Sequence, residues 1–239
     1  MTCTRYVAFR MYDTKTQQRY LDYNKTEPTA LIFMASSETR VSRDLYRVED
    51  KSLSSADIEL HLGYIGRTSH NSVATLTDNN TGMVLVRNVN QVVNVDRTTH
   101  KPIPISDWWR VIYGSYAVEK KSLEVAEEIV PNEKIYWYEL KVAWSEIDFY
   151  QHTNYLSYVK FCFDAAMDAV SNQFYTMFHK DILNYHVKSV RSFYKGESVA
   201  GDILNIASWE DNSNPFLLHF SIQKGSNILF QSHVEFYCD

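Results

Sequence analysis

Four polar side chains that could act on a bound carbonyl group stand together just before a long apolar stretch. Asp148, Gln151, His152 and Asn154 occupy segment 148–154. An acid and an imidazole at this spacing can polarise a carbonyl compound and exchange protons with it. About 20 residues with almost no charge follow, which is the length of one buried helix. The first-turn N–H groups of such a helix point at whatever lies at its mouth.

The size and composition of the chain indicate a globular protein with a sizeable core. The 239 residues suit one large domain or two small ones, and 45% of them are hydrophobic against 22% charged. A net charge of -5 argues against nucleic-acid binding, because neutralising phosphates requires a surplus of lysine and arginine. Only seven glycines are present, which disfavours a glycine-rich phosphate loop.

The cysteines and the apolar runs indicate where such a protein works. Cys3, Cys162 and Cys238 form an odd, sparse set that fits a reducing compartment better than a disulfide framework. We expect Cys162 to be a small core residue. The sequence shows neither an apolar run long enough for a membrane span nor a secretory signal, so a cytoplasmic location is expected. The eight histidines are scattered without metal spacing, so no metal site is predicted.

Hydrophobic periodicity predicts strands and two long helices. The first helix is expected over 20–35, and the second follows Asn154 with an apolar surface that must be covered on all sides. Segment 36–55 is expected to be a loop or an amphipathic piece, and 111–134 a charged linker. Trp108–Trp109 is expected to be a packing anchor rather than a ligand platform. The predicted strands cover 4–12, 57–65, 71–77, 83–95, 135–144, 185–194, 202–209, 216–223 and 228–237.

The two halves of the chain are similar to each other. A shift of 135 (148 minus 13) places VAFRMYDTKTQQRYLDY on VAWSEIDFYQHTNYLSY without a gap and Gly66 on Gly201. We interpret this as a tandem duplication. At positions that could do chemistry the halves differ, as His152 falls on Gln17 and Glu197 on Leu62. One half has therefore kept titratable groups that the other lacks.

A duplication of this kind predicts an α+β fold with two tandem units. Each unit would be a long central helix wrapped by a curved antiparallel sheet, and the two would form an intramolecular pseudo-dimer. The expected boundaries are 1–104 for a first unit with a degenerate site, 105–134 for a linker, and 135–239 for the unit with the site. A further homodimer is left open.

At this point the chain resembles the hotdog-fold thioesterases, and most of all the tandem acyl-carrier-protein thioesterases known from plants. That family carries Asp-x-Asn-x-His-x-Asn-Asn at the start of the second hotdog helix. Asp148, His152 and Asn154 match this motif, whereas Tyr150 and Tyr155 stand where the family has asparagine. Farther on, the family's Tyr-Arg-Arg-Glu-Cys corresponds to YKGES, which places Glu197 on the catalytic glutamate.

The resemblance implies hydrolysis of a fatty-acyl thioester on acyl carrier protein or coenzyme A, without a metal or organic cofactor. The acyl chain would lie in a tunnel between helix and sheet. Asp148, His152 and Glu197 would be catalytic, and Tyr150, Asn154 and Tyr155 would contact the substrate. His152 and Glu197 would activate a water, or Asp148 would act as base or nucleophile, with helix N–H groups stabilising the oxyanion.

Two other functions remain open at this stage. Tyrosine cannot copy the donor and acceptor pair of an amide, so Tyr150 also allows a protein that binds an acyl or other hydrophobic ligand without catalysis. A hotdog dehydratase or isomerase is the third candidate, although dehydratases usually place histidine and acid differently.

Overall fold

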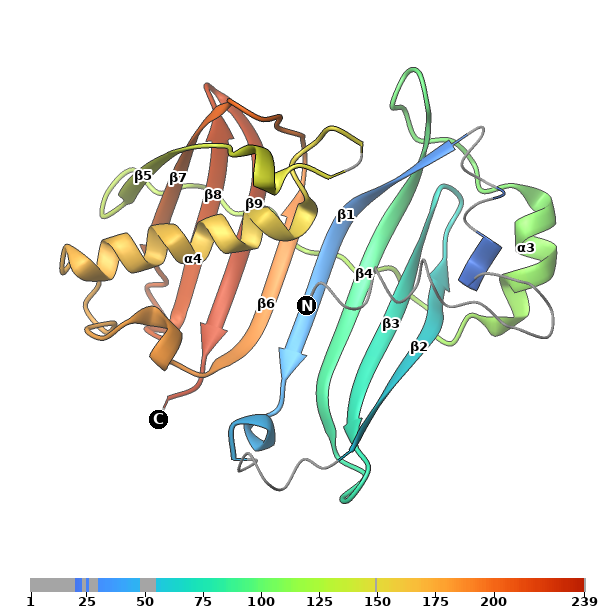
Figure 1. The fold of residues 1–239 in the computed structure, drawn as a ribbon, viewed down its shortest axis with the longest axis horizontal. Helices are drawn as coiled ribbons and strands as arrows, with labels where there is room; N and C mark the ends of the chain where they lie inside the picture. The colour runs from blue at the N-terminus through green and yellow to red at the C-terminus, as the bar shows by residue number, and fades with distance from the viewer. Residues whose placement is uncertain (1–19, 23–24, 26–29, 48–54, 149, 239) are drawn as a thin grey trace. The chain divides into compact units, whose positions relative to one another are not determined.

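The computed structural model describes residues 20–22, 25, 30–47, 55–148 and 150–238 (Figure 1). The chain forms two compact units. The first comprises Met1–Ser36 and Leu53–Glu124, and the second comprises Ser37–Ser52 and Val125–Asp239. The strand predicted over 4–12 lies outside the described residues. No helix within the described ranges has the length and apolar character that crossing a membrane requires.

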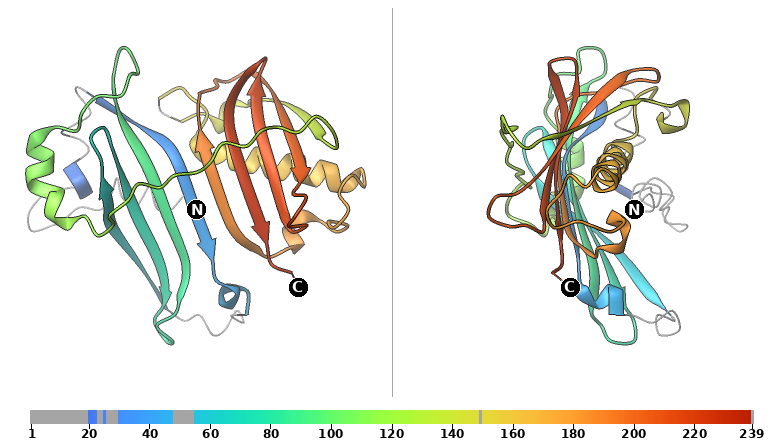
Figure 2. Two further views of the ribbon diagram at one scale, coloured as in Figure 1. Left: turned by 180° about the vertical axis from the view of Figure 1, so that it is seen from behind. Right: turned by 90° about the vertical axis from the view of Figure 1, so that its left-hand side faces the viewer.

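The second unit is an antiparallel sheet with a helix across one face (Figures 1 and 2). Its strands run in the order β6-β9-β8-β7-β5, and α4 contacts β5, β7 and β9. The elements are β5 (Tyr136–Lys141), α4 (Tyr155–Ser171), β6 (Val187–Tyr194), β7 (Ile203–Glu210), β8 (Leu217–Lys224) and β9 (Asn227–Phe236). The strands predicted for this half are thus confirmed, except that β5 ends at Lys141 and Trp144 opens a short 3-10 helix, η4 (Trp144–Glu146).

Among the described residues of the second unit, α4 is covered on one side only, which corrects the expectation of an all-round buried helix. The side that faces the sheet consists of Tyr158, Phe161, Cys162, Ala165 and Ala169, all buried. The small side chains of Cys162, Ala165 and Ala169 allow the backbone of the helix to approach the strands closely. The opposite side carries charged, exposed residues at positions 160 and 164. Burial raises the pKa of the Cys162 thiol, as expected of a core cysteine.

The strands of the first unit run in the order β2-β3-β4-β1, and β2, β3 and β4 pair in antiparallel fashion. A separate small core joins these strands to α3, in which Trp109 is buried and donates from Nε1 to the carbonyl of Leu21 at 2.8 Å. Trp109 is therefore a packing anchor, as predicted, whereas Trp108 is exposed and the prediction is wrong for it. The elements are β1 (Ala30–Val41), β2 (Ala56–Ile65), β3 (Ser69–Asp78), β4 (Val84–Asp96) and α3 (Asp107–Tyr113), and β1 ends in the second unit.

Two predictions for the first half are wrong where the structure describes it. The helix predicted over 20–35 is a strand from Ala30 onward, and the loop predicted over 36–55 begins with the rest of that strand, as far as Val41. Short apolar runs do not distinguish strand from helix by periodicity, and pairing within a sheet decides between them. The linker predicted over 111–134 also begins with helical residues, since α3 ends at Tyr113.

The constant shift of 135 does not extend into the sheets. Gly201 directly precedes β7, whereas Gly66 directly follows β2. Likewise Glu197 lies between β6 and β7, whereas Leu62 lies inside β2. These two pairs of residues are therefore not structurally equivalent.

Candidate functional site

The loop that carries the predicted site is a tight turn between η4 and α4. The Asp148 N–H donates to the carbonyl of His152 at 2.8 Å, and the Gln151 N–H donates to the carbonyl of Asp148 at 3.0 Å. Gln151 has a φ of 67°, in the left-handed region that tight turns use. This short backbone ring fixes where the His152 side chain leaves the loop.

His152 and Glu197 meet although they lie far apart in the sequence. His152 Nδ1 is 2.8 Å from Glu197 Oε2, and the two side chains are 30% and 36% exposed. A carboxylate accepts hydrogen bonds, so Nδ1 is the donor and Nε2 of the neutral ring keeps its lone pair. The pair can therefore take up a proton at Nε2 while Glu197 balances the imidazolium charge.

A buried hydroxyl network holds the His152–Glu197 pair together. Thr153 follows His152 in the chain, and its N–H and Oγ1 donate to the carbonyl of Ser198 at 2.8 and 3.0 Å. The Ser198 hydroxyl lies 2.7 Å from Thr153 Oγ1 and 2.9 Å from the Tyr158 hydroxyl. All three residues of the network are buried. The network joins the two loops by fixed hydrogen bonds immediately beside His152 and Glu197.

Sequence reasoning did not single out Thr153 and Tyr158, and it noted Ser198 only as a replacement for the family's cysteine. The only signals in the sequence were that Thr153 follows His152, that Ser198 follows Glu197, and that Tyr158 lies one turn into the predicted helix. Burial raises the pKa of the Tyr158 hydroxyl, which therefore stays protonated and can donate to Ser198.

Asp148 and Asn154 both have local structural roles in the loop. Asp148 Oδ1 accepts a hydrogen bond from the Tyr150 N–H at 2.9 Å, which is an Asx turn. Asn154 is the N-cap of α4, and its Oδ1 accepts from the Leu156 N–H at 3.0 Å. The Ser157 N–H bonds the Asn154 carbonyl at 2.8 Å. Two first-turn N–H groups are thus already satisfied within the helix cap, so they are not available to an oxyanion.

The two tyrosines of the motif lie at different depths. Tyr155 is buried and its ring contacts Tyr194, whose hydroxyl donates to the Tyr155 carbonyl at 3.2 Å. Tyr150 is half-buried at the turn. Tyr155 therefore belongs to the wall behind the loop, while Tyr150 remains beside the carboxylate of Asp148.

The interior next to the pair is filled with aromatic rings. The Tyr158 ring stacks on Phe230 with centroids 5.4 Å apart, and the Tyr194 ring meets Phe230 at 4.9 Å. Phe230 is fully buried. These rings occupy the side of α4 where the expected tunnel would begin.

Comparison with solved structures identifies the fold. The 12:0-ACP thioesterase from Umbellularia californica superposes with a TM-score of 0.69 at 15% identity, over 91% of this chain and 79% of the other. An acyl-ACP thioesterase from Bacteroides thetaiotaomicron gives a TM-score of 0.64 at 16% identity, over 88% of this chain and 78% of the other. The chain shares the hotdog fold of these two thioesterases.

At the level of sequence, no family model matches the chain, and no curated protein matches it. The hotdog likeness therefore rests on the arrangement of the antiparallel sheet. Identities of 15% and 16% establish that arrangement and leave the chemistry to the residues of the site itself.

Proposed function

We propose that this hotdog protein hydrolyses acyl thioesters at the His152–Glu197 pair. The observation that carries the proposal is the 2.8 Å contact between His152 Nδ1 and Glu197 Oε2, at the mouth of a capped apolar helix. The acyl-ACP thioesterases that share the fold support this class of substrate.

In the proposed reaction His152 Nε2 removes a proton from a water molecule as the water oxygen attacks the thioester carbonyl. The new C–O bond gives a tetrahedral intermediate. The C–S bond then breaks, and the thiolate takes the proton from the imidazolium, so that a free acid and a thiol leave. Glu197 keeps the ring oriented and compensates its transient positive charge, as a carboxylate does for a catalytic histidine.

We propose that Asp148 supports this step through the turn, with nucleophilic attack by its carboxylate as the alternative. Support for the turn role comes from Oδ1, which accepts from the Tyr150 N–H. Tyr150 and Asn154 line the approach to His152 in this proposal, and Tyr155 backs it.

We further propose that the acyl group is short. The rings of Tyr158, Tyr194 and Phe230 fill the interior beside the pair, and a long chain would have to displace well-packed aromatic side chains. Both carriers, acyl carrier protein and coenzyme A, present the same thioester, so the structure of the pair favours neither.

The tandem arrangement is proposed on the strand orders. In the first unit β2-β3-β4-β1 repeats the order that β7-β8-β9-β6 has in the second. We propose that the two orders descend from one duplicated hotdog unit, with 1–104 and 135–239 as the repeats and 105–134 as the linker.

Release of free thiol tests the proposed function directly. The purified full chain is offered acyl-coenzyme A and acyl carrier protein thioesters of increasing acyl length, and the expected result is turnover that falls as the chain lengthens. If neither carrier series is hydrolysed, the proposal is wrong. Extraction of a bound hydrophobic ligand from the same inactive protein would then establish the binding role.

A further inference from the structure

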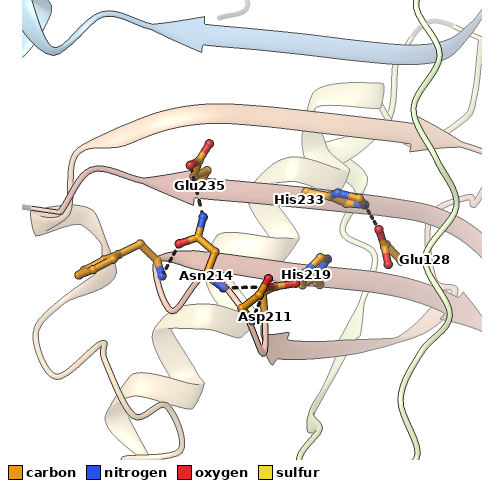
Figure 3. A network of polar contacts seen from close by, with 8 residues as sticks. Glu128, Asp211, Asn214, His219, His233 and Glu235 are labelled. Carbon is orange, nitrogen blue, oxygen red and sulfur yellow. Dashed lines mark hydrogen bonds and ion pairs between the residues drawn. The ribbon is translucent and has the colours of Figure 1, made fainter.

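A second group of histidines lies on the face of the same sheet that α4 does not cover (Figure 3). His219 on β8 and His233 on β9 are directly opposite each other in the antiparallel register. Their ring centroids are 4.9 Å apart. The residues that alternate with them, Leu218, Phe220 and Val234, belong to the core under α4. Strand alternation therefore turns both imidazoles to the outer face.

A carboxylate is brought to the two rings by the segment that leads into β5. Gln231, buried on β9, holds the backbone of Glu128 on both sides: Glu128 N–H donates to Gln231 Oε1 at 3.1 Å, and Gln231 Nε2 donates to the Glu128 carbonyl at 2.7 Å. Glu128 Oε1 then lies 3.8 Å from His233 Nε2. One ligand atom each from Glu128, His219 and His233 lies within 4.8 Å of the others. We call these three residues the outer cluster.

The ring of His219 is oriented by an acid behind it. Its Nε2 is 3.0 Å from Asp211 Oδ2, and the ring stacks on Trp209. Because the carboxylate accepts, Nε2 carries the proton and Nδ1 of the neutral ring has the lone pair. A carboxylate behind an imidazole is the usual way in which proteins orient a metal-binding histidine.

Each imidazole of the outer cluster has one ring nitrogen that is buried and forms no hydrogen bond with the described residues. His219 Nδ1 and His233 Nε2 have no hydrogen-bond partner among the described residues. The side chain of His219 is only 6% exposed. A buried polar atom without a partner destabilises the folded chain, so a cation that accepts these lone pairs would remove that penalty.

The outer cluster borders a cavity, and the charges around it suit a cation. Glu128, Asp211 and His219 line a cavity of about 690 Å³ in the second unit. Arg191 lies opposite His233 in the register, but Glu38 pairs with the Arg191 guanidinium at 2.8 Å and offsets its charge. Two carboxylates, Glu128 and Asp211, thus remain beside the two imidazoles.

We propose that Glu128, His219 and His233 form a binding site for a divalent transition-metal ion, with Zn²⁺ as the best match. Two imidazole nitrogens and one carboxylate oxygen are a common zinc ligand set, and a water would complete a tetrahedron. Ligand atoms around tetrahedral zinc lie about 3.3 Å apart. The separation between Glu128 Oε1 and His233 Nε2 is 3.8 Å, and all three ligand atoms lie within 4.8 Å of one another, so side-chain rotations must bring them closer when the ion binds. The proposal is independent of the thioesterase proposal.

Zinc titration of the chelator-treated full chain tests this site. We expect one equivalent of Zn²⁺ to bind, and one equivalent of Co²⁺ to give the visible absorption of a tetrahedral ion. Glu128→Gln and His233→Gln should each weaken binding by more than about tenfold, and Asp211→Asn by about 10- to 100-fold through the orientation of His219.

The control is His152→Gln, which removes the other imidazole–carboxylate pair and should leave zinc binding unchanged. Glu128→Gln is the safer variant for folding, because Gln231 bonds only the backbone of residue 128. The proposal is overturned if the unmodified chain binds no zinc, or if Glu128→Gln and His233→Gln bind it as tightly as the unmodified chain. Loss of binding in His152→Gln alone would place the metal at the other pair and also overturn it.

Discussion

The His152–Glu197 pair and the outer cluster combine the same kinds of side chain in opposite surroundings. His152 and Glu197 are 30% and 36% exposed and stand on connections between elements. His219 and His233 are 6% and 14% exposed and stand on paired strands. Contact with water lets an imidazole exchange protons during a reaction, whereas desolvated lone pairs fixed on a sheet favour coordination of a cation. The difference in burial therefore favours proton transfer at His152–Glu197 and cation binding at the outer cluster, as proposed above. The residue types alone are the same in both places and do not distinguish the two.

The largest expected effect tests the exposed side of this comparison. His152→Ala should lower kcat for thioester hydrolysis by about 10²–10⁴-fold, because the general base is removed. Thiol release under saturating substrate is the measurement. His61→Ala, which removes an exposed imidazole on β2, is the control and should leave kcat unchanged. Equal activity of the two variants would assign the proton transfer to another group.

Substitution of the two acids near His152, Glu197 and Asp148, should lower kcat by different amounts. Glu197→Gln removes the charge that balances the imidazolium and should lower kcat by about 10²-fold. Asp148→Asn keeps an oxygen that can accept from the Tyr150 N–H, so it should change kcat by less than about tenfold if Asp148 only shapes the turn. The same kinetic assay compares them. A larger loss in Asp148→Asn than in Glu197→Gln would instead favour the nucleophilic role.

Acid should destabilise the protein through its buried imidazoles, and His70 in the first unit isolates that effect. Burial lowers the pKa of His70 from 6.5 to about 4. Between these pH values the unfolded chain binds the proton and the folded chain does not, so stability present above pH 6.5 is lost as the pH falls toward 4. The loss is on the order of 3 kcal/mol.

Urea unfolding at several pH values measures this contribution. The His70→Gln variant should show a flatter decline below pH 6.5, while His61→Gln, at an exposed position, should decline as the unmodified chain does. If His70→Gln declines as steeply as the unmodified chain, the buried ring is not what makes the protein sensitive to acid.

The smallest expected effect concerns the network that holds the pair in place. Ser198→Ala leaves the Tyr158 hydroxyl and Thr153 Oγ1 without one partner each, which should cost about 1–3 kcal/mol of unfolding free energy. A parallel fall in kcat with little change in KM is expected, because the two loops lose their fixed spacing. Ser226→Ala, in the exposed turn before β9, is the control. A variant with reduced stability but unchanged kcat would show that the network does not position His152.

Much of the second half of the chain could be predicted because its signals are local. Alternation placed β6 to β9 within a few residues, the apolar stretch after Asn154 predicted α4, and Asn154 itself caps that helix. The buried side of α4 was not predicted, because a nearly uncharged helix carries too little contrast to mark one face. The sheet decides it by packing against Tyr158, Phe161 and Ala165.

The sequence by itself determined the chemistry available at the loop, since Asp148, His152 and Asn154 are neighbours along one turn. The family resemblance named Glu197 as well, but only tertiary structure decided that Glu197 contacts His152, that Ala30–Val41 is a strand, and that His219, His233 and Glu128 meet. The physical reason is that strand register and loop packing join residues distant in sequence. A lone histidine or glutamate carries no local sign of its partner until hydrogen bonding between strands sets which residues lie opposite one another.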